Sequence, residues 1–430
     1  MTRPRAPLPE NPASIQTKEV IEVMRNILII GAGDFQLPLV ERASRYYNVL
    51  LAAPVVSDMF RPYIKDTLLI DVRDKDAILA YARENDICGV ITDQTDIAVR
   101  SVAYVAEQMG LPGIGYETGV LFTDKSLMRT RMQELGIRLL PNRTVNSLEE
   151  ALDYYSELGG DVIIKPLDTQ GSRGVQICRC ASDLEAKYAE AARWSSTHQV
   201  LVERYATGRE FVVEGVAVDY EFVNACIGDT LYFDLPDAFA AKSRIFPTVA
   251  DDRLRQRVLD LNTRIIKGFG LRQGITHSEF IMDGNEIYLI ETAARGGGVF
   301  ISSDLIHLSC GLDTEKFLLD IATGQQHGLP EILPQQCVCG YLAFYIPTGT
   351  VVSVQGVQDV LALPYVHRNQ LGKLRVGMVN EDGHTDKTSR LALIVSAPDR
   401  RTFEARAKTI RDLLKVETMT RDGIKPLIWE

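Results

Sequence analysis

Apolar runs and amphipathic stretches alternate along the first third of the chain. Asn26–Ile30 is a short, almost entirely apolar run that ends in Gly31 and Gly33, as a buried parallel strand does. Further strands are predicted at Val49–Ala53, Leu68–Asp71 and Gly89–Thr92, and helices at Pro38–Arg45 and Asp74–Asn85. This alternation predicts a small doubly wound α/β domain over residues 24–122.

The middle of the chain changes to pairs of short strands around turns. Asp124 is a good N-cap for a helix that runs to Leu135, before Gly136. Strand pairs are predicted at Val162–Lys165 with Val175–Cys178, at Val200–Glu203 with Glu210–Val218, and at Thr276–Met282 with Glu286–Glu291. The last pair flanks Asp283-Gly284-Asn285, a strong hairpin signal, so residues 123–330 should be α+β with antiparallel sheets.

The two ends of the chain differ from the middle. The first 23 residues hold four prolines and no apolar segment, which indicates a flexible leader and not a signal peptide. Beyond residue 330 we expect a C-terminal α+β subdomain over 331–430, with strands at Val338–Ile346 and Leu391–Ser396 and a helix at Phe403–Leu414. Within the 123–330 domain, residues of about 160–205 are expected to form a mobile lid.

Composition narrows the class of protein. With 430 residues, 46% of them hydrophobic, the chain can bury a full core. Its net charge of -10 argues against nucleic-acid binding, and no apolar run approaches the roughly 18 residues of a membrane span. The seven cysteines form no CxxC pair, and Cys178/Cys180 and Cys337/Cys339 are interpreted as small thiols in a reducing cytoplasm, with a metal site as the less favoured alternative.

A loop after Lys165 is a candidate for phosphate binding. Gly171, Ser172, Arg173 and Gly174 lie between two predicted strands, and such a loop can offer backbone N–H groups to a polyphosphate. Lys165 supplies a fixed positive charge, as could Lys125 at the start of the predicted helix, with Arg129 one turn further on. The alternatives are a mobile hairpin tip and a solvated helix face.

Two acidic groups are candidates for nucleotide and metal binding. The stretch that contains Glu203, Tyr205, Ala206 and Glu210 could meet an adenine edge and a ribose. Pairing around the hairpin turn would put Glu279 and Glu291 on neighbouring strands, opposite or diagonal, where two carboxylates repel unless a cation lies between them. Two glutamates and a triphosphate make a plausible Mg²⁺ shell, and the alternative is that one glutamate points into solvent.

Arg295 follows the second glutamate and precedes three glycines. The glycines Gly296, Gly297 and Gly298 leave room for a substrate, and the guanidinium can hold a carboxylate or a transferring phosphoryl group.

Taken in order, these pieces resemble an ATP-grasp enzyme over about residues 25–330. The strings His277-Ser278-Glu279 and Glu291–Gly297 are most similar to those of L-amino-acid ligases that make dipeptides. The resemblance implies an ATP-grasp fold, α/β and α+β in several domains, with a Rossmann-like N-terminal domain. It also implies ATP with Mg²⁺, or Mn²⁺ in its place, as cofactors, and a cytoplasmic homodimer.

The same resemblance implies roles for individual residues. Lys125 and Lys165 would contact the phosphates, the 168–174 loop would cover them, and Glu203, Tyr205, Ala206 and Glu210 would line the adenosine. Glu279 and Glu291 would hold the metal, and Arg295 would steady the acyl phosphate. Substrate contacts are expected from His277, Gly296 and Gly297, and Ala293 stands where many members have a metal-binding asparagine. Lys242 is expected to be catalytic together with Arg295; it or Arg244 would supply a further phosphate or substrate contact, and the alternative is a solvated loop.

The expected function is an ATP-dependent carboxylate–amine ligase that releases ADP and phosphate. Alternatives within the same resemblance act on bicarbonate or on a sugar- or nucleotide-precursor carboxylate. A dehydrogenase that uses Gly31 and Gly33 is disfavoured because Gln36 replaces the third glycine of the dinucleotide fingerprint. A catalytically silent ATP-binding protein is disfavoured because Glu279, Glu291 and Arg295 are all present.

Overall fold

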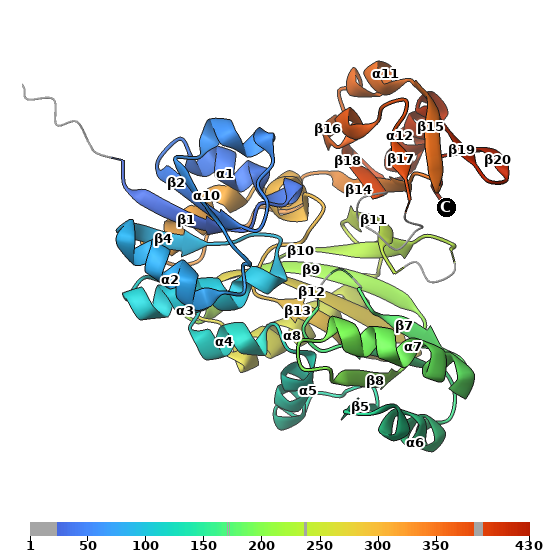
Figure 1. Cartoon of the computed structure of the whole chain (residues 1–430), viewed down its shortest axis with the longest axis horizontal. Coiled ribbons are helices and arrows are strands. Elements are labelled where there is room, and N and C mark those ends of the chain that lie inside the picture. The colour runs from blue at the N-terminus through green and yellow to red at the C-terminus, as the bar shows by residue number, and fades with distance from the viewer. Residues whose placement is uncertain (1–23, 170, 172, 236–238, 382–389) are drawn as a thin grey trace, which may run out of the picture.

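The structure is a computed structural model of the chain, and it describes residues 24–169, 171, 173–235, 239–381 and 390–430. Four sheets organise these residues (Figure 1). The N-terminal sheet stands above the middle strands of a large central sheet, which continues upward into the C-terminal region, and a smaller antiparallel sheet lies below it. The leader 1–23 and Ser172 lie outside the described residues.

The N-terminal sheet is parallel, in the order β3-β2-β1-β4. Its inner strands are almost fully buried because helices cover both faces, which explains their unbroken apolar runs. The strands are β1 (Asn26–Ile30), β2 (Asn48–Ala53), β3 (Asp66–Leu69) and β4 (Ile87–Ile91). The helices are α1 (Leu37–Ala43), α2 (Lys75–Glu84), α3 (Val99–Met109) and α4 (Tyr116–Leu121), with short 3₁₀ turns at Asp34–Gln36, Asp58–Tyr63 and Asp96–Ala98.

Gln36 fills the turn after β1. Its side chain is buried, donates to the Ile30 carbonyl at 3.1 Å and to Thr92 Oγ1 at 3.0 Å, and accepts from the Gly33 N–H at 3.0 Å. A Cβ on Gly31 would lie 2.5 Å from the Gln36 amide, so the two residues fit each other and not a pyrophosphate. This geometry is unfavourable for dinucleotide binding at the turn.

The small antiparallel sheet has the order β5-β8-β6-β7. Helix α5 (Lys125–Glu134) precedes this sheet, and Asp124 caps its N-terminal N–H groups as expected. Two further helices cover the sheet. The strands are β5 (Asn142–Val145), β6 (Val162–Pro166), β7 (Gln176–Cys178) and β8 (Val200–Arg204), and the covering helices are α6 (Leu148–Leu158) and α7 (Ala181–Trp194).

One predicted pairing is wrong. The strand at Val200–Glu203 was expected to pair with the strand at Glu210–Val218, but β8 pairs with β5 and β6, whereas β9 (Arg209–Val218) pairs with β10 and β12 in the central sheet. Thr207-Gly208 is therefore not a hairpin turn. A Cβ on Gly208 would lie only 1.9 Å from the Met282 carbonyl, so this glycine allows the connection between the two sheets to pass close to the central sheet.

The central sheet has eight strands, in the order β13-β12-β9-β10-β11-β14-β18-β16. The expected hairpin around Asp283–Asn285 is confirmed as the β12–β13 pair. Helix α8 (Asp252–Phe269) packs on β10, which buries one face of the sheet. The strands other than β9 are β10 (Glu221–Tyr232), β11 (Ala241–Phe246), β12 (Gly274–Asp283), β13 (Glu286–Ala293), β14 (Val338–Tyr345), β16 (Val366–Asn369) and β18 (Arg390–Ala397).

One apolar core joins the N-terminal domain to the central sheet. It includes Ile29 of β1, Val216 of β9 and Phe317 of α10, all nearly inaccessible to solvent. The segment after β13 supplies the link through a π-type turn at Ile301–Leu305, α9 (Ile306–Cys310) and α10 (Thr314–Ala322). The loop that carries Arg295 is thus held between two domains.

The C-terminal residues extend the central sheet through β14, β18 and β16, so this sheet runs across position 330. They also form a four-stranded sheet with the order β17-β15-β19-β20. Its strands are β15 (Gly349–Gln355), β17 (Val379–Asn380), β19 (Lys415–Thr420) and β20 (Gly423–Pro426), and the helices of this region are α11 (Val357–Leu361), α12 (Arg400–Leu413) and a 3₁₀ turn at Leu371–Lys373.

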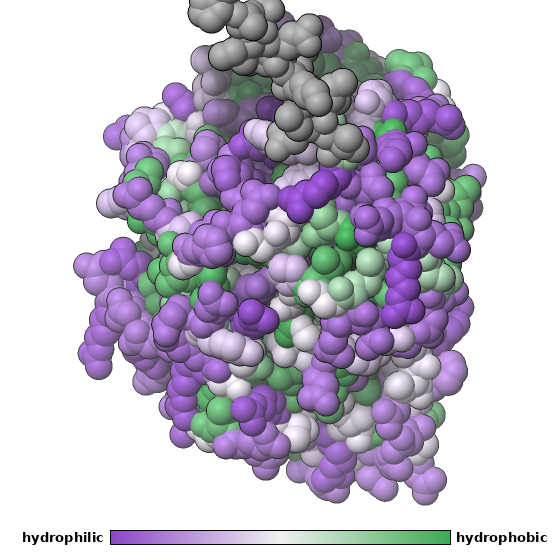
Figure 2. Space-filling model, turned by 90° about the vertical axis from the view of Figure 1, so that its left-hand side faces the viewer, coloured by the Kyte–Doolittle hydropathy of each residue, from purple (hydrophilic) through white to green (hydrophobic). Residues whose placement is uncertain are grey.

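The surface seen from the side of the N-terminal domain is mainly hydrophilic, with small separate apolar areas (Figure 2). In the part of the chain that the structure describes, every helix is too short or too polar to span a bilayer.

Candidate active site

The candidate site lies where the small antiparallel sheet meets the central sheet. Carboxylates on β8, β12 and β13 face cations from α5, β6 and β11, which come from both sides of the connection 205–208. Most of these side chains were predicted from the sequence, and the structure brings them together at this junction of the two sheets.

Glu203 on β8 is the most deeply buried of the carboxylates. It has no solvent exposure, and it accepts hydrogen bonds from Arg129 Nε at 2.8 Å and from Lys165 Nζ at 2.6 Å. Burial alone would raise the pKa of Glu203, but the charges and hydrogen bonds of Arg129 and Lys165 outweigh it and lower the pKa to about 2. Arg129 Nη2 also donates to the Ile290 carbonyl at 2.8 Å, which ties α5 to β13.

Lys125 joins the glycine loop to the predicted metal carboxylates. It is the first residue of α5, it is 6% exposed, and its Nζ lies 2.9 Å from Glu291 Oε1 and 3.0 Å from the Thr169 carbonyl. Its backbone N–H donates to the Leu167 carbonyl at 3.1 Å. The ammonium group is therefore positioned between the loop and β13.

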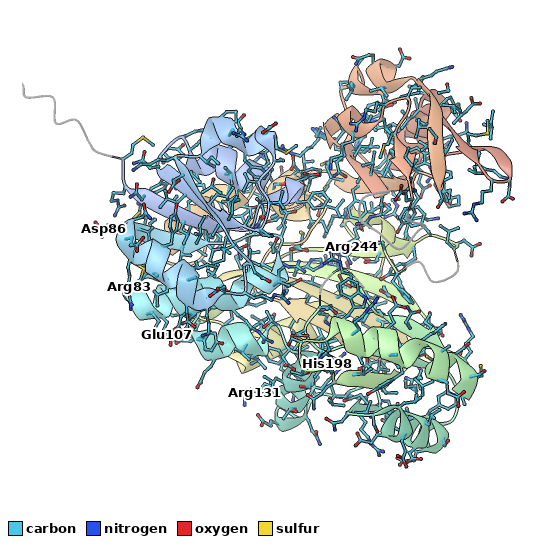
Figure 3. All side chains as sticks on the ribbon, in the orientation of Figure 1. Arg83, Asp86, Glu107, Arg131, His198 and Arg244 are labelled. Carbon is cyan, nitrogen blue, oxygen red and sulfur yellow. The ribbon has the colours of Figure 1, made fainter. Side chains whose placement is uncertain are left out.

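Glu279 and Glu291 are directly opposite each other in the β12–β13 register, so the predicted pairing of these strands is confirmed. Their side chains are 24% and 35% exposed, which leaves both open to a ligand. Arg244 Nη2 donates to Glu279, and Figure 3 shows Arg244 near the middle of the molecule. Burial would raise the pKa of Glu279, but Arg244 and His277 hold it well below its usual range.

His277 lies between two glutamates. Its Nδ1 contacts Glu214, and its Nε2 is 3.0 Å from Glu279 Oε1 and 2.8 Å from Arg244 Nη1. Burial lowers the pKa of His277, but the charge of Glu214 and the hydrogen bonds to Glu214 and Glu279 together outweigh it and raise the pKa above its ordinary value. Glu214 also accepts from the Gly297 N–H at 3.2 Å, so this pair links Glu279 to the three glycines after Arg295.

Arg295 makes a bidentate pair with Asp96, a residue of the N-terminal domain. Nε and Nη2 each donate to one Asp96 oxygen at 2.8 Å, while Nη1 donates to the Gly296 carbonyl at 2.9 Å. The Gly296 N–H donates to Asp93 at 3.2 Å, and burial raises the pKa of Asp93 to about 6.

The glycines Gly296 and Gly297 are tightly enclosed. A Cβ on Gly296 would lie 2.2 Å from Ser302 Oγ, and one on Gly297 would lie 2.8 Å from both Glu214 and His277. The structure thus gives these glycines a packing role in addition to the substrate role that the sequence suggests.

The residues predicted to line adenosine lie along the connection between the two sheets. Ala206 is 8% exposed and packs with Leu140 and Ile281. The Tyr205 N–H donates to the Asp161 carbonyl at 2.9 Å. On β9, Glu210 accepts from Tyr232 Oη at 2.6 Å, and burial raises the pKa of Glu210 to about 7, helped by the charge of Glu279.

The described residues of the glycine loop adopt the backbone that glycine favours. Gly171 and Gly174 have φ of +67° and +71°. Gly174 leaves no room for a Cβ beside Trp194, and the Arg173 guanidinium lies 5.7 Å from the centre of the same ring. Arg173 is thus directed at α7 in this structure. Ser172, predicted for the same loop, is outside the described residues.

Lys242 is placed differently from the other predicted residues. Its ammonium contacts Glu430 of the C-terminal region, whereas Arg244 reaches Glu279 and His277. Of the two residues considered for this contact, Arg244 is therefore the one at the site.

Sequence reasoning missed Glu214, Asp93 and Asp96. The two aspartates follow β4, and the end of a parallel strand is a usual place for ligand-binding residues, which is the signal that could have found them. Glu214 was missed because it stands alone in the apolar part of β9 from Phe211 to Val218, and its partners His277 and Gly297 are distant in the sequence.

The donor set at Glu279 and Glu291 fits a hard divalent cation. Mg²⁺ takes one or two carboxylates and leaves other positions to phosphate oxygens and water, and the two partly exposed carboxylates sit on adjacent strands. Ala293 adds no donor.

Comparison with known proteins finds a family model and relatives that are similar to this chain. Residues 124–329 match the family model described as the carbamoyl-phosphate synthase L chain, ATP binding domain. The alanine–anticapsin ligase of Bacillus subtilis is 25% identical over 274 residues, which are 58% of this chain and 57% of that protein. The chain thus spans a little over half the length of that relative.

Solved structures share the fold over nearly the whole chain. The L-amino acid ligase from Bacillus licheniformis has a TM-score of 0.77 at 21% identity and covers 92% of this chain and 99% of its own. The biotin carboxylase domain of 2-oxoglutarate carboxylase from Hydrogenobacter thermophilus has a TM-score of 0.73 at 17% identity, with 94% and 91% covered. The expected mixed α/β multidomain fold is confirmed.

Proposed function

We propose that residues 124–329 form an ATP-grasp domain and that the chain is an ATP-dependent ligase that joins a carboxylate, specifically that of an amino acid, to an amine. The reaction would proceed through an acyl phosphate and release ADP and phosphate. One observation carries the proposal: Lys125, Glu291 and Glu279 lie together beside Arg295, at the meeting of the two sheets.

The lysine and arginine side chains that pair with the carboxylates of the site would also contact a bound nucleotide. Lys125 is paired with Glu291 and Arg244 with Glu279. A triphosphate that entered between the sheets would offer oxygens to Lys125 and Lys165. Mg²⁺ held by Glu279 and Glu291 would offset the negative charge of the phosphates.

The reaction has two group transfers. A substrate carboxylate oxygen attacks the γ-phosphorus, the bond from that phosphorus to the β–γ bridging oxygen breaks, and ADP leaves. The amine then attacks the acyl carbon, loses a proton, and the carbon–oxygen bond to phosphate breaks. Arg295 would leave Asp96 in part to stabilise the negative charge on the acyl phosphate, which needs preorganised positive charge and the exclusion of water.

Charges beside Arg295 support an amino acid as substrate. An α-amino acid carries a carboxylate for the guanidinium and an ammonium for an acid. Asp93 accepts from the Gly296 N–H and Asp96 pairs with Arg295, and burial outweighs the charge of Arg295 in raising the pKa of Asp93. Bicarbonate offers no ammonium, so the acidic groups disfavour it as the substrate.

The proposal also includes a cytoplasmic homodimer and the use of Mn²⁺ in place of Mg²⁺. The biotin carboxylase domain from Hydrogenobacter thermophilus was solved as a dimer, which supports the first part. Light scattering of the purified chain tests whether it also forms a dimer.

A phosphate-release screen over pairs of amino acids, with bicarbonate as a separate well, tests the function. We expect release of phosphate only with amino acids present, and equal amounts of ADP and phosphate by chromatography. Formation of AMP would contradict the acyl-phosphate route, and turnover with bicarbonate alone would favour the carboxylase-type alternative. Arg295→Ala should lower kcat by about 100-fold or more, as the loss of a transition-state contact does.

A further inference from the structure

A cavity of about 170 Å³ lies between helix α12 and the central sheet, outside the nucleotide site. Its apolar wall includes Ile245 and Leu342 of the sheet, Phe403 and Ala407 of α12, and Trp429. The space is similar to the roughly 150 Å³ that accommodates a benzene molecule in an engineered cavity. It suits an apolar group of the size of a phenyl ring.

The charged residues that line this cavity are mainly basic. Lys242, Arg400, Lys408 and Arg411 line it, against the single acid Glu404. Arg411 Nε is buried and has no hydrogen-bond partner among the described residues, and Arg400 Nε lies 3.5 Å from Glu404 without a hydrogen bond. Both guanidinium groups are paired through Nη1, Arg411 with Glu430 and Arg400 with Asp229, so their Nε–H groups are what remains for a further acceptor.

Glu430 shows how a carboxylate can be held here. Its side chain reaches Lys242 on one side and Arg411 Nη1 at 2.6 Å on the other, and these cations lower the pKa of Glu430. The side chain is nevertheless 63% exposed, so an incoming carboxylate can displace it. The Arg411 guanidinium also lies 5.8 Å from the centre of the Trp429 ring, which places the cation beside the apolar wall.

We propose that this cavity binds a small organic acid with an apolar body of phenyl size. The apolar body fills the space between Phe403 and Trp429, and the carboxylate replaces that of Glu430 on Lys242 and Arg411. The ligand gains apolar burial and a charge-assisted hydrogen bond together. Arg411 Nε gains an acceptor as well.

The cavity is separate from the nucleotide site but shares two strands with it. On β10, Leu231 lines the cavity while the next residue, Tyr232, holds Glu210. On β11, Lys242 lines it while Arg244 holds Glu279. Binding at the cavity can therefore be measured without ATP, and its outcome does not depend on the proposed ligase activity.

Trp429 is a built-in reporter for the experiment. The chain has two tryptophans, and Trp194→Phe leaves Trp429 as the only one. We expect phenylacetate to change the fluorescence of this variant with a Kd of about 1 mM or below. Phenylacetamide, which lacks the charge, and acetate, which lacks the apolar body, should each bind at least about tenfold more weakly.

Substitutions in the same background identify the charged contacts. Arg411→Met should weaken phenylacetate binding by about tenfold or more, whereas Arg401→Met, which removes an exposed charge of the same helix outside the cavity, should leave the Kd unchanged. Glu430→Gln should tighten binding by about threefold or more because the competing carboxylate is gone.

Three results would overturn the proposal. They are no fluorescence change up to about 10 mM phenylacetate, equal affinities for phenylacetate and phenylacetamide, and equal effects of Arg411→Met and Arg401→Met. Thermal unfolding of every variant shows whether Arg411→Met is folded, and if it is not, the comparison of Glu430→Gln with its parent decides: tightening supports the proposal and no change refutes it.

Discussion

The glutamates on the two sides of the candidate site pair with their cationic side chains in different ways. Glu203 on β8 is completely buried and is shared by Arg129 and Lys165. Glu279 and Glu291 on the central sheet are 24% and 35% exposed, and each has its own cation. The same residue type is thus a fully buried ion-pair partner on one side of the site and a partly exposed carboxylate, open to a ligand, on the other.

Burial explains this difference. A fully buried carboxylate stays ionised only beside fixed cations, and it cannot give up such a partner without a large cost in free energy. A half-exposed carboxylate is stabilised by water as well, so it can release its cation to a phosphate or accept a metal ion. We therefore expect substitution of Glu203 to affect stability, and substitution of Glu291 to affect nucleotide turnover.

Glu203→Gln should show the largest effect. It leaves Arg129 and Lys165 buried without a counter-charge, so we expect the free energy of unfolding at pH 7 to fall by about 3–5 kcal/mol. Urea unfolding followed by circular dichroism measures this. A loss below about 1 kcal/mol would mean that Glu203 does not neutralise these cations, and the comparison would fail.

Glu291→Gln should act mainly on turnover. Loss of one of the two carboxylates proposed to bind the metal should lower ATP-dependent phosphate release by about 100-fold, which equals roughly 2.7 kcal/mol in the activation free energy. Stability should fall by less than in Glu203→Gln, because Lys125 keeps its hydrogen bond to the Thr169 carbonyl.

Glu286→Gln is the matched control for that variant. Glu286 is on the same hairpin and pairs with Arg138 at the surface, where the two side chains are 47% and 64% exposed. Turnover in this control should stay within about twofold of the parent. If both variants lost activity equally, disturbance of the hairpin and not metal binding would be the cause.

The pH dependence of stability that Glu210 causes gives a further test of how burial and neighbouring cations act on these glutamates. The pKa of Glu210 is raised to about 7 in the folded chain, whereas an unfolded glutamate titrates near 4.5. Between these values the folded state binds more protons, so Glu210 makes the free energy of unfolding fall as pH rises, by about 2 kcal/mol. Glu203 acts in the opposite direction: its contribution is present above pH 4.5 and is lost as pH falls toward its pKa of about 2.

Glu210→Gln should therefore remove part of the decline in stability between pH 5 and pH 7.5. Urea unfolding at several pH values in this interval checks it. Parallel stability curves for the parent and the variant would show that Glu210 titrates as it does in the unfolded chain.

Much of the site could be predicted from the sequence because its signals are local. The Asp283–Asn285 turn fixes the β12–β13 register as far as Phe280, which places Glu279 and Glu291 close together on adjacent strands. Their direct opposition depends on an irregularity between Glu279 and Phe280, because a regular ladder would put Glu279 opposite Ile290. The Asp124 cap likewise fixes where α5 begins, and so places Lys125 at its first residue.

Contacts between distant segments could not be predicted. Arg129 and Lys165 meet Glu203 across 74 and 38 residues of chain, and Arg295 meets Asp96 across 199. These contacts depend on which strands share a sheet, and the Thr207-Gly208 connection was mistaken for a hairpin turn. Local pattern cannot tell a turn within one sheet from a connection between two.

The choice between Lys242 and Arg244 was also beyond the sequence. The β10–β11 pairing has an irregularity between Leu231 and Tyr232, beside Ala241. Such an irregularity increases local twist and changes the direction of side chains along a strand. Lys242 and Arg244, which a regular strand would point the same way, consequently reach different partners.

The smallest expected effect comes from a second arginine–glutamate pair on α5. Arg131 lies two residues after Arg129, and its Nη1 is 2.8 Å from Glu134 Oε2, but the two side chains are 42% and 57% exposed (Figure 3 labels Arg131). Glu134→Gln should reduce the free energy of unfolding by less than about 0.5 kcal/mol, since water and salt screen an exposed pair. Arg131 also keeps its bond to the Gly268 carbonyl at 3.0 Å, so the helix stays anchored to α8. The same substitution on two arginine partners of one helix thus isolates burial as the variable. A loss at Glu134 as large as that at Glu203, measured by urea unfolding in about 0.15 M salt, would show that helix position and not burial sets the cost.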